Sequence, residues 1–240
     1  MRRGSLVQLV VFALVATAVA LALAVFPPWL PTAASKEAGR IHFVFWFVTV
    51  ICIAIFALVA AMIAYSILKF RAPPDDDSDG PPIHGHTGLE IAWTAVPTAL
   101  VVSIAIVSAV VLAQNGHAGR DPLRVNVTAQ QFAWTFSYPE QHVTSPVLVV
   151  PLGQSVKLRF TAKDVIHSFW VPEWSQKQDT VPGLHPTLVV TPNKLSGKKG
   201  FPIVCTELCG LGHALMRSEA VVVTPAAFEK WARGRAKGKS

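Results

Sequence analysis

The sequence predicts a helical membrane anchor followed by one all-β domain, and the composition gives the first reason. Of the 240 residues, 52% are hydrophobic and only 15% are charged, whereas an average soluble domain carries about 25% charged residues. The apolar excess lies almost entirely before Gln114, and the remainder has the composition of an ordinary globular domain. An entirely soluble, disordered or collagen-like chain is therefore excluded.

Three uncharged apolar runs account for the predicted anchor. They cover residues 6–26, 41–68 and 91–113, and are 21, 28 and 23 residues long. Because about 20 apolar residues cross a bilayer as a helix, each run is long enough to span it. We expect the second and third runs to form a transmembrane helical hairpin over residues 35–114.

The first run has two possible fates. Arg2 and Arg3 precede it and a Pro-Pro pair follows it, a pattern that fits either a secretory signal or a retained helix. Residues 32–34 (Thr-Ala-Ala) are a candidate cleavage site. Residues 1–34 are therefore predicted to be a signal sequence or an additional transmembrane helix.

The loop 69–90 between the two hairpin helices is predicted to be a solvated turn. Two Pro-Pro pairs and a cluster of four aspartates interrupt any helical pattern there. Lys69 and Arg71 favour the cytoplasmic side for this loop. That orientation places residues 115–240 on the outer, periplasmic face of the membrane.

Glu90 and Cys52 are two residues of the predicted anchor with side chains that could have a chemical role. Thr87 and Glu90 have the spacing of a capping box for the helix that begins there. Glu90 also lies at the inner membrane edge, where a carboxylate could accept protons. Cys52 has no partner cysteine within reach and is expected to be a small apolar filler.

The outer domain, residues 115–226, is predicted to be all-β. Val156, Leu158 and Phe160 alternate with polar residues, as in a half-buried strand. Short runs rich in Val, Phe and Thr, separated by Pro and Gly turns, suggest a sandwich or Greek-key barrel. The expected strands cover residues 124–128, 132–138, 146–150, 155–162, 187–191, 201–205 and 219–224.

One stretch of this domain concentrates metal-binding chemistry. Cys205, Cys209, His213 and Met216 fall within 12 residues, and sulfur with imidazole selects copper, zinc or iron–sulfur centres. A single-copper site needs only one cysteine, so two cysteines point to two coppers that share thiolates. A second histidine is then required, and His167, at the end of a strand, is well placed to supply it.

Two simpler interpretations compete with copper. Outside the cytoplasm, Cys205 and Cys209 could form a structural disulfide, but a disulfide gives no reason for His213 and Met216. Zinc usually takes four Cys or His ligands and has little use for a methionine. The pattern favours a binuclear copper site over both.

With these residues in view, the chain resembles subunit II of the heme–copper cytochrome c oxidases over nearly its whole length. Two transmembrane helices before a cupredoxin-like Greek-key domain are that family's layout, and Cys-x-Glu-x-Cys-x-x-x-His-x-x-Met is its CuA signature. The resemblance implies a multi-pass protein of the cell membrane in an oxidoreductase and translocase complex. Oxygen reduction itself would take place in subunit I.

The resemblance also implies the ligands of the CuA centre. Cys205 and Cys209 would bridge the two coppers, His167 and His213 would each bind one copper, and Met216 would be an axial ligand.

Two carboxylates gain further roles from the resemblance. Glu207 would offer its backbone carbonyl to copper, and its side chain would help hold a magnesium ion shared with subunit I. Glu90 matches the family's carboxylate at the mouth of a proton channel.

The expected partners are heme-containing subunit I, subunit III, membrane lipid, and cytochrome c or another small redox donor. Electrons would pass from the donor to CuA and on to heme in subunit I. Where many members have a tryptophan that receives the electron, this sequence has Phe132, and Trp134 aligns with a later aromatic. Either the electron enters through Phe132 or Trp134, or the donor docks differently.

The charge of the outer part bears on its partners. Residues 120–240 carry 15 Lys and Arg against 8 Asp and Glu, and five of the positive charges lie in the C-terminal tail, 227–240. A strongly acidic dock for a basic cytochrome c is therefore not evident, although complementary charge speeds docking. The tail is expected to lie disordered against anionic lipid, and nucleic acid is not an expected partner.

Three other functions remain open at this point. A nitric oxide reductase of the same superfamily can carry a CuA subunit. A quinol oxidase subunit II shares the fold but usually lacks the copper ligands. A membrane-anchored copper-binding or copper-delivery protein is the third alternative, and it leaves Glu90 and the Glu207 side chain without a purpose.

Overall fold

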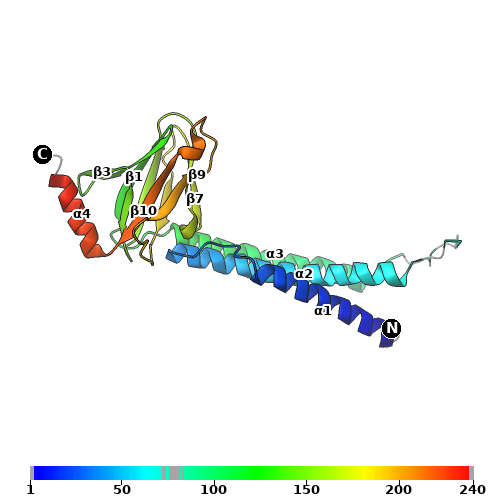
Figure 1. Ribbon diagram of the computed structural model, residues 1–240. Helices are drawn as coiled ribbons and strands as arrows, with labels where there is room; N and C mark the ends of the chain where they lie inside the picture. Colours follow the sequence, from blue (N-terminus) through cyan, green and yellow to red (C-terminus); the bar gives the residue numbers. More distant parts are fainter. Residues whose placement is uncertain (1–2, 72–73, 76–79, 81, 83, 238–240) are drawn as a thin grey trace. The chain divides into compact units, whose positions relative to one another are not determined.

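A computed structural model describes residues 3–71, 74–75, 80, 82 and 84–237 (Figure 1). The chain divides into two compact units, Met1–Trp29 with Val44–Ala109, and Leu30–Phe43 with Val110–Ser240. Parts of the predictions made above lie outside the described residues. These are Arg2 before the first run, Pro73, Pro81 and the aspartates 76, 77 and 79 of the loop, and Lys239 of the tail.

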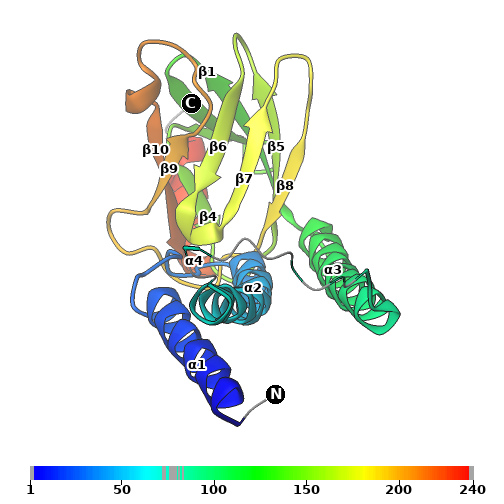
Figure 2. The ribbon, with the colours of Figure 1, turned by 90° about the vertical axis from the view of Figure 1, so that its right-hand side faces the viewer.

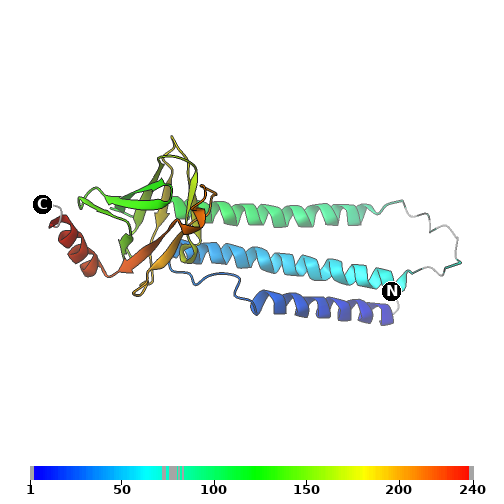
Figure 3. The same cartoon turned by 45° about the horizontal axis from the view of Figure 1, so that its top comes forward.

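The first unit contains most of the long apolar helices, drawn in blue to green in Figure 3, whereas their residues 36–43 and 110–116 belong to the second unit. The helices are α1 (Arg3–Val25), α2 (Lys36–Lys69) and α3 (Thr87–Gly116). Each has a segment long and apolar enough to cross a membrane, which confirms the three predicted runs. α2 and α3 extend beyond the second and third apolar runs at both ends, because polar residues there continue the helical hydrogen bonding.

The start of α3 corrects the predicted capping box by one residue. The carboxylate of Glu90 accepts a hydrogen bond from the backbone N–H of His86 at 3.3 Å, and His86 Nδ1 accepts one from the N–H of Leu89 at 3.2 Å. His86, not Thr87, is therefore the capping residue, since an imidazole nitrogen can satisfy a free helical N–H as a hydroxyl does.

The second unit is built around two five-stranded sheets that face each other (Figure 2). One sheet has the order β3-β2-β1-β5-β8, and the other has the order β4-β10-β9-β6-β7. This arrangement confirms the predicted all-β sandwich. The strands are β1 (Leu123–Gln130), β2 (Ala133–Tyr138), β3 (Val143–Ser145), β4 (Leu148–Pro151), β5 (Val156–Ala162), β6 (His167–Val171), β7 (Gln176–Thr180), β8 (Thr187–Val190), β9 (Phe201–Cys205) and β10 (Arg217–Val223).

Strands β3, β6 and β7 were absent from the predicted strands. β7 has the sequence Gln-Lys-Gln-Asp-Thr, which carries no apolar signal, and it forms because its backbone pairs with β6 from His167↔Thr180 to Val171↔Gln176. β3 has only three residues, too few to show alternation. Pairing with a neighbouring strand, rather than hydropathy, therefore determines that β3 and β7 form.

The first turns of α2 belong to the same compact unit as the sheets. The N–H of Ala34 donates to the carbonyl of Glu173 at 2.8 Å, and Ser35 forms a β-bridge with Pro192. The buried Glu37 carboxylate accepts a hydrogen bond from the N–H of Thr191 at 2.8 Å. The segment before the second apolar run is thus tied to the β-sandwich.

The C-terminal tail is not disordered over its described residues, which corrects the expectation made above. Residues Pro225–Lys237 form α4. Phe228 and Ala232 are buried, and the ring of Trp231 packs on Tyr138 with centroids 5.1 Å apart. These apolar residues recur at helical spacing, so one face of α4 covers the sandwich.

Tyr138 gives a test of how the sandwich is held together. Its buried hydroxyl accepts from the N–H of Val149 at 2.7 Å and donates to the carbonyl of Val149 at 2.9 Å. Tyr138→Phe should lower the free energy of unfolding by about 1–3 kcal/mol, because both backbone groups lose their partner. Chemical denaturation followed by circular dichroism measures this change. The exposed Thr144→Ala in β3 is the control, expected within about 0.5 kcal/mol of the parent.

Candidate metal centre

The predicted ligands come from two places in one sheet. His167 is the first residue of β6 and Cys205 is the last residue of β9. Cys209, His213 and Met216 lie in the loop between β9 and β10. Turns fold this loop back on itself, with the N–H of His213 donating to Gly210 and the N–H of Met216 donating to His213.

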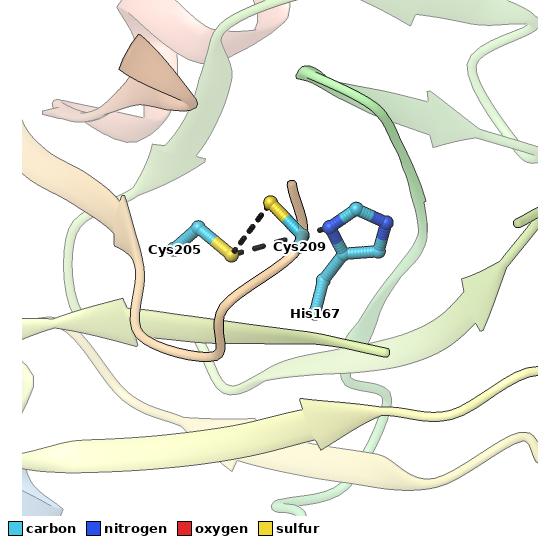
Figure 4. Close-up of side chains that lie close together, drawn as sticks. All are labelled: His167, Cys205 and Cys209. Atoms are coloured by element: carbon cyan, nitrogen blue, oxygen red, sulfur yellow. Dashed lines mark hydrogen bonds between the residues drawn. The ribbon is translucent and has the colours of Figure 1, made fainter. Parts of the chain in front are cut away.

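The structure brings the side chains of His167, Cys205 and Cys209 together, as Figure 4 shows. The Sγ atoms of the two cysteines lie 3.9 Å apart, and His167 Nδ1 lies 4.0 Å from Cys205 Sγ. One potential ligand atom from each of these three residues lies within 4.8 Å of the others. Such a group could hold a metal ion.

The remaining predicted ligands lie around the same two sulfurs. His213 Nδ1 is 3.6 Å and Met216 Sδ is 3.7 Å from Cys209 Sγ. The carbonyl oxygen of Glu207 is 3.3 Å from Cys205 Sγ. Two thiols, two imidazoles, a thioether and a carbonyl therefore converge, a donor set that suits a copper thiolate centre.

The structure argues against the disulfide interpretation. Among the described residues, Cys52, Cys205 and Cys209 are all free thiols, and the 3.9 Å between the paired sulfurs is far beyond the roughly 2.05 Å of a disulfide. Burial, and then the neighbouring Cys205 thiol, raise the pKa of Cys209 to about 11. A bound cation would reverse this effect, because a coordinating thiol is deprotonated.

Asp164 fixes the orientation of His167. Its Oδ1 lies 2.8 Å from His167 Nε2. A carboxylate can only accept a hydrogen bond, so Nε2 carries the proton and Nδ1 faces the sulfurs with its lone pair. Burial acts to raise the pKa of Asp164, but hydrogen bonds from Gln131, His167 and Val165 outweigh it and lower that pKa to about 2. No motif in the sequence indicates this role for Asp164.

The residues around the cysteine–histidine group differ in burial. His167, Phe169 and Met216 are fully buried. Leu211 and Leu215, in the loop after β9, are highly exposed. The two thiols and His167 are nevertheless buried, so the exposed leucines lie outside the group.

The two aromatic candidates differ in position. Trp134 is 2% exposed and packs edge-on against His167, with ring centroids 6.2 Å apart. Phe132 is 39% exposed and lies against the ligand loop. A Cβ added to Gly212 would lie 2.5 Å from Cδ2 of the Phe132 ring, so the glycine is what allows this approach.

Glu90 belongs to the other compact unit, in the first turn of α3. It lines an open groove along that helix together with Thr87, Thr94 and Thr98. The Glu207 side chain is exposed at the ligand loop. Neither carboxylate belongs to the buried group.

A membrane anchor, an all-β domain and a buried cysteine–histidine group define a membrane-anchored protein with a candidate metal centre. The family profile "Cytochrome C oxidase subunit II, transmembrane domain" matches residues 22–111, and "Cytochrome C oxidase subunit II, periplasmic domain" matches residues 141–224. The chain belongs to the cytochrome c oxidase subunit II family, with a CuA-type domain. As a member of this family it is a membrane-bound subunit of an oxidase complex, and its β-domain matches the periplasmic domain of the family.

Two relatives with 31–32% identity agree with this assignment. Cytochrome c oxidase subunit 2 of Synechocystis sp. is 32% identical over 86% of this chain and 76% of its own length. The protein of the same name from Thermostichus vulcanus is 31% identical over 85% of this chain and 77% of its own length. The periplasmic domain of cytochrome oxidase subunit II from Bradyrhizobium japonicum aligns with a TM-score of 0.47 and 25% identity, over 52% of this chain and all of that domain.

Gly212 provides a test of the packing between Phe132 and the ligand loop. Gly212→Ala should destabilise the domain by about 1–3 kcal/mol, because the added methyl group overlaps the ring. Removing the ring with Phe132→Ala should recover most of that loss in the double variant, as measured by chemical denaturation. Gly234→Ala in α4 is the matched control, since a Cβ there meets nothing within 4 Å. An equal loss with and without the Phe132 ring would contradict this contact.

Proposed function

We propose that this chain holds a binuclear copper centre and uses it to transfer electrons within the oxidase. Cys205 and Cys209 would bridge two coppers, with His167 and His213 as terminal ligands and Met216 as an axial ligand. The backbone carbonyl of Glu207 would complete the set. The convergence of the other four groups on the two free thiols carries the proposal.

The residues of the chain suit a one-electron relay. When bound, a thiolate-bridged copper pair stores one electron that is shared between both metals. Strand β6 and the turns of the loop hold the ligands in place, so their positions change little when charge enters or leaves. Buried Phe169 and Trp134 keep water from the inner side of the centre, and this apolar environment tunes the potential.

Electrons would come from cytochrome c or another small redox donor and pass to heme in subunit I, where oxygen is reduced. Phe132 is the better candidate for the point where they enter, because its ring is partly exposed and contacts the ligand loop. Trp134 is buried behind His167. We place the contact with the donor over Phe132.

The remaining assignments follow the same proposal. The exposed Glu207 carboxylate would help hold magnesium at the boundary with subunit I, and subunit III would be a further partner. Residues 69–90 would face the cytoplasm, with Glu90 at the mouth of a proton channel. In that arrangement the complex acts as a translocase as well as an oxidoreductase.

Copper stoichiometry tests the centre directly. The full-length chain is purified in detergent, loaded with copper under reducing conditions and then oxidised with a one-electron oxidant. It should then hold two coppers that share one unpaired electron by electron paramagnetic resonance. Cys209→Ser should abolish that signal, because one bridge is lost. Cys52→Ser is the matched control and should leave the signal unchanged, since Cys52 lies in α2.

Three outcomes of this experiment would overturn the proposal. They are a single copper, a preference for zinc, and a disulfide between Cys205 and Cys209 that survives reduction and reconstitution.

The position of Phe132 makes a kinetic prediction. In the purified oxidase complex, Phe132→Ala should lower kcat/KM for the reduced donor by roughly tenfold, the cost of deleting a central aromatic contact. The copper signal should persist. Leu195→Ala is the control. This exposed leucine lies before the start of β9, whereas Cys205 is the last residue of that strand. Unchanged kcat/KM in Phe132→Ala would place the donor elsewhere.

A further inference from the structure

We infer that Gln131 and Asp164 form one hydrogen-bonded support that positions two copper ligands at once. This inference rests on the proposed copper centre. All the proposed ligands come from β6, β9 and the loop after β9, in one sheet. Gln131 and Asp164 follow β1 and β5 of the other sheet. The opposite sheet would thus contribute the support but no ligand.

The two supporting residues are brought together by the pairing of their strands. β1 and β5 are parallel neighbours, in register from Leu123↔Val156 to Ala129↔Ala162. Parallel strands end at the same edge of a sheet. The residues that follow them therefore lie side by side, and the backbone N–H of Gln131 donates to Asp164 Oδ2 at 2.7 Å.

One arm of the support reaches His167. Asp164 Oδ1 accepts from His167 Nε2 and also from the N–H of Val165, each at 2.8 Å. The His167 side chain is fully buried, whereas that of Asp164 is 30% exposed. The carboxylate thus holds the imidazole from the side away from the sulfurs and leaves Nδ1 facing Cys205.

The other arm reaches Cys209. The side-chain amide of Gln131 donates to the carbonyl oxygen of Cys209. The next residue, Gly210, has φ of +128°, and a Cβ there would lie 2.8 Å from Gln131 Nε2. Glycine thus serves both the backbone conformation and the close approach of the amide. The amide holds the backbone of the loop immediately after a bridging thiolate.

The two arms meet in Gln131, so a shift of this residue would move both ligands. Its side chain fixes the loop of Cys209, and its backbone fixes the carboxylate that orients His167. Both residues are positioning residues, since neither offers an atom to the metal. Hydrogen bonds of this kind to ligating groups tune the metal as well as hold its ligands.

Two nearly isosteric substitutions test the support in the full-length, copper-loaded chain in detergent. Asp164→Asn removes the negative charge beside His167. It should raise the reduction potential by at least 59 mV. For one electron this corresponds to a tenfold increase in the ratio of reduced to oxidised centre at a fixed applied potential. Gln131→Met removes the amide donor. It should change the copper hyperfine splitting while two coppers remain bound.

A double variant tests whether the two residues act as one unit. If they do, the change in copper hyperfine splitting caused by Gln131→Met should be smaller in the Asp164→Asn background than in the parent. The exposed neighbour Gln130→Met and the exposed Asp121→Asn are matched controls, both expected to leave potential and splitting unchanged. Strictly additive shifts would overturn the link between the residues.

The outcomes separate this inference from the proposed function. If the parent chain fails to form the copper pair, the proposed function fails. If the parent forms it and both single variants keep its spectrum and potential, the support fails alone. If Gln131→Met does not fold, Asp164→Asn still decides whether the carboxylate tunes the centre through His167.

Discussion

The pairing of β6 with β9 is the constraint on which the candidate centre depends. Phe169 lies opposite Cys205 in this antiparallel pair, so both side chains point to the same face. His167 is two residues from Phe169 and therefore shares that face. A slip of one residue would turn His167 away from Cys205 and onto the outer face of its sheet. The register of β6 and β9 thus determines whether His167 and Cys205 can bind the same metal centre.

Burial beside a second sulfur makes the Cys209 thiol unfavourable to ionise in the absence of a metal. The raised pKa of Cys209 expresses this cost, since a thiolate there would face low polarity and a second sulfur. A cation supplies the missing charge, so binding of metal and loss of the thiol protons are coupled. The same burial that disfavours ionisation would protect a bound metal from water. On the outer side, exposed Leu211 and Leu215 leave an apolar surface that the described chain does not cover.

The ligand loop shows how small residues serve a metal centre. Gly210 and Gly212 carry no side chain, so Gln131 and Phe132 can lie directly against the loop backbone. Side chains that follow a strand of the other sheet thereby reach a loop that is also held by its own turns and by the hydrogen bond from the N–H of Thr206 to the carbonyl of Ser168. The centre is consequently supported from both layers of the sandwich, although its candidate ligands come from one.

The sequence by itself determined the membrane helices, the class of the domain and the candidate ligands. Apolar length, strand alternation in residues 155–162 and the spacing of Cys205, Cys209, His213 and Met216 are local signals, legible without neighbours. The polar strand β7, the helical tail α4 and the cap at His86 depend on partners distant in sequence or on side-chain geometry, and were missed or misplaced. The tertiary structure alone decided that Asp164 and Gln131 stand behind the ligands, that Trp134 is buried and that Leu211 is exposed. The reason is physical: composition fixes what a segment can bury, but only strand pairing and packing decide which groups meet.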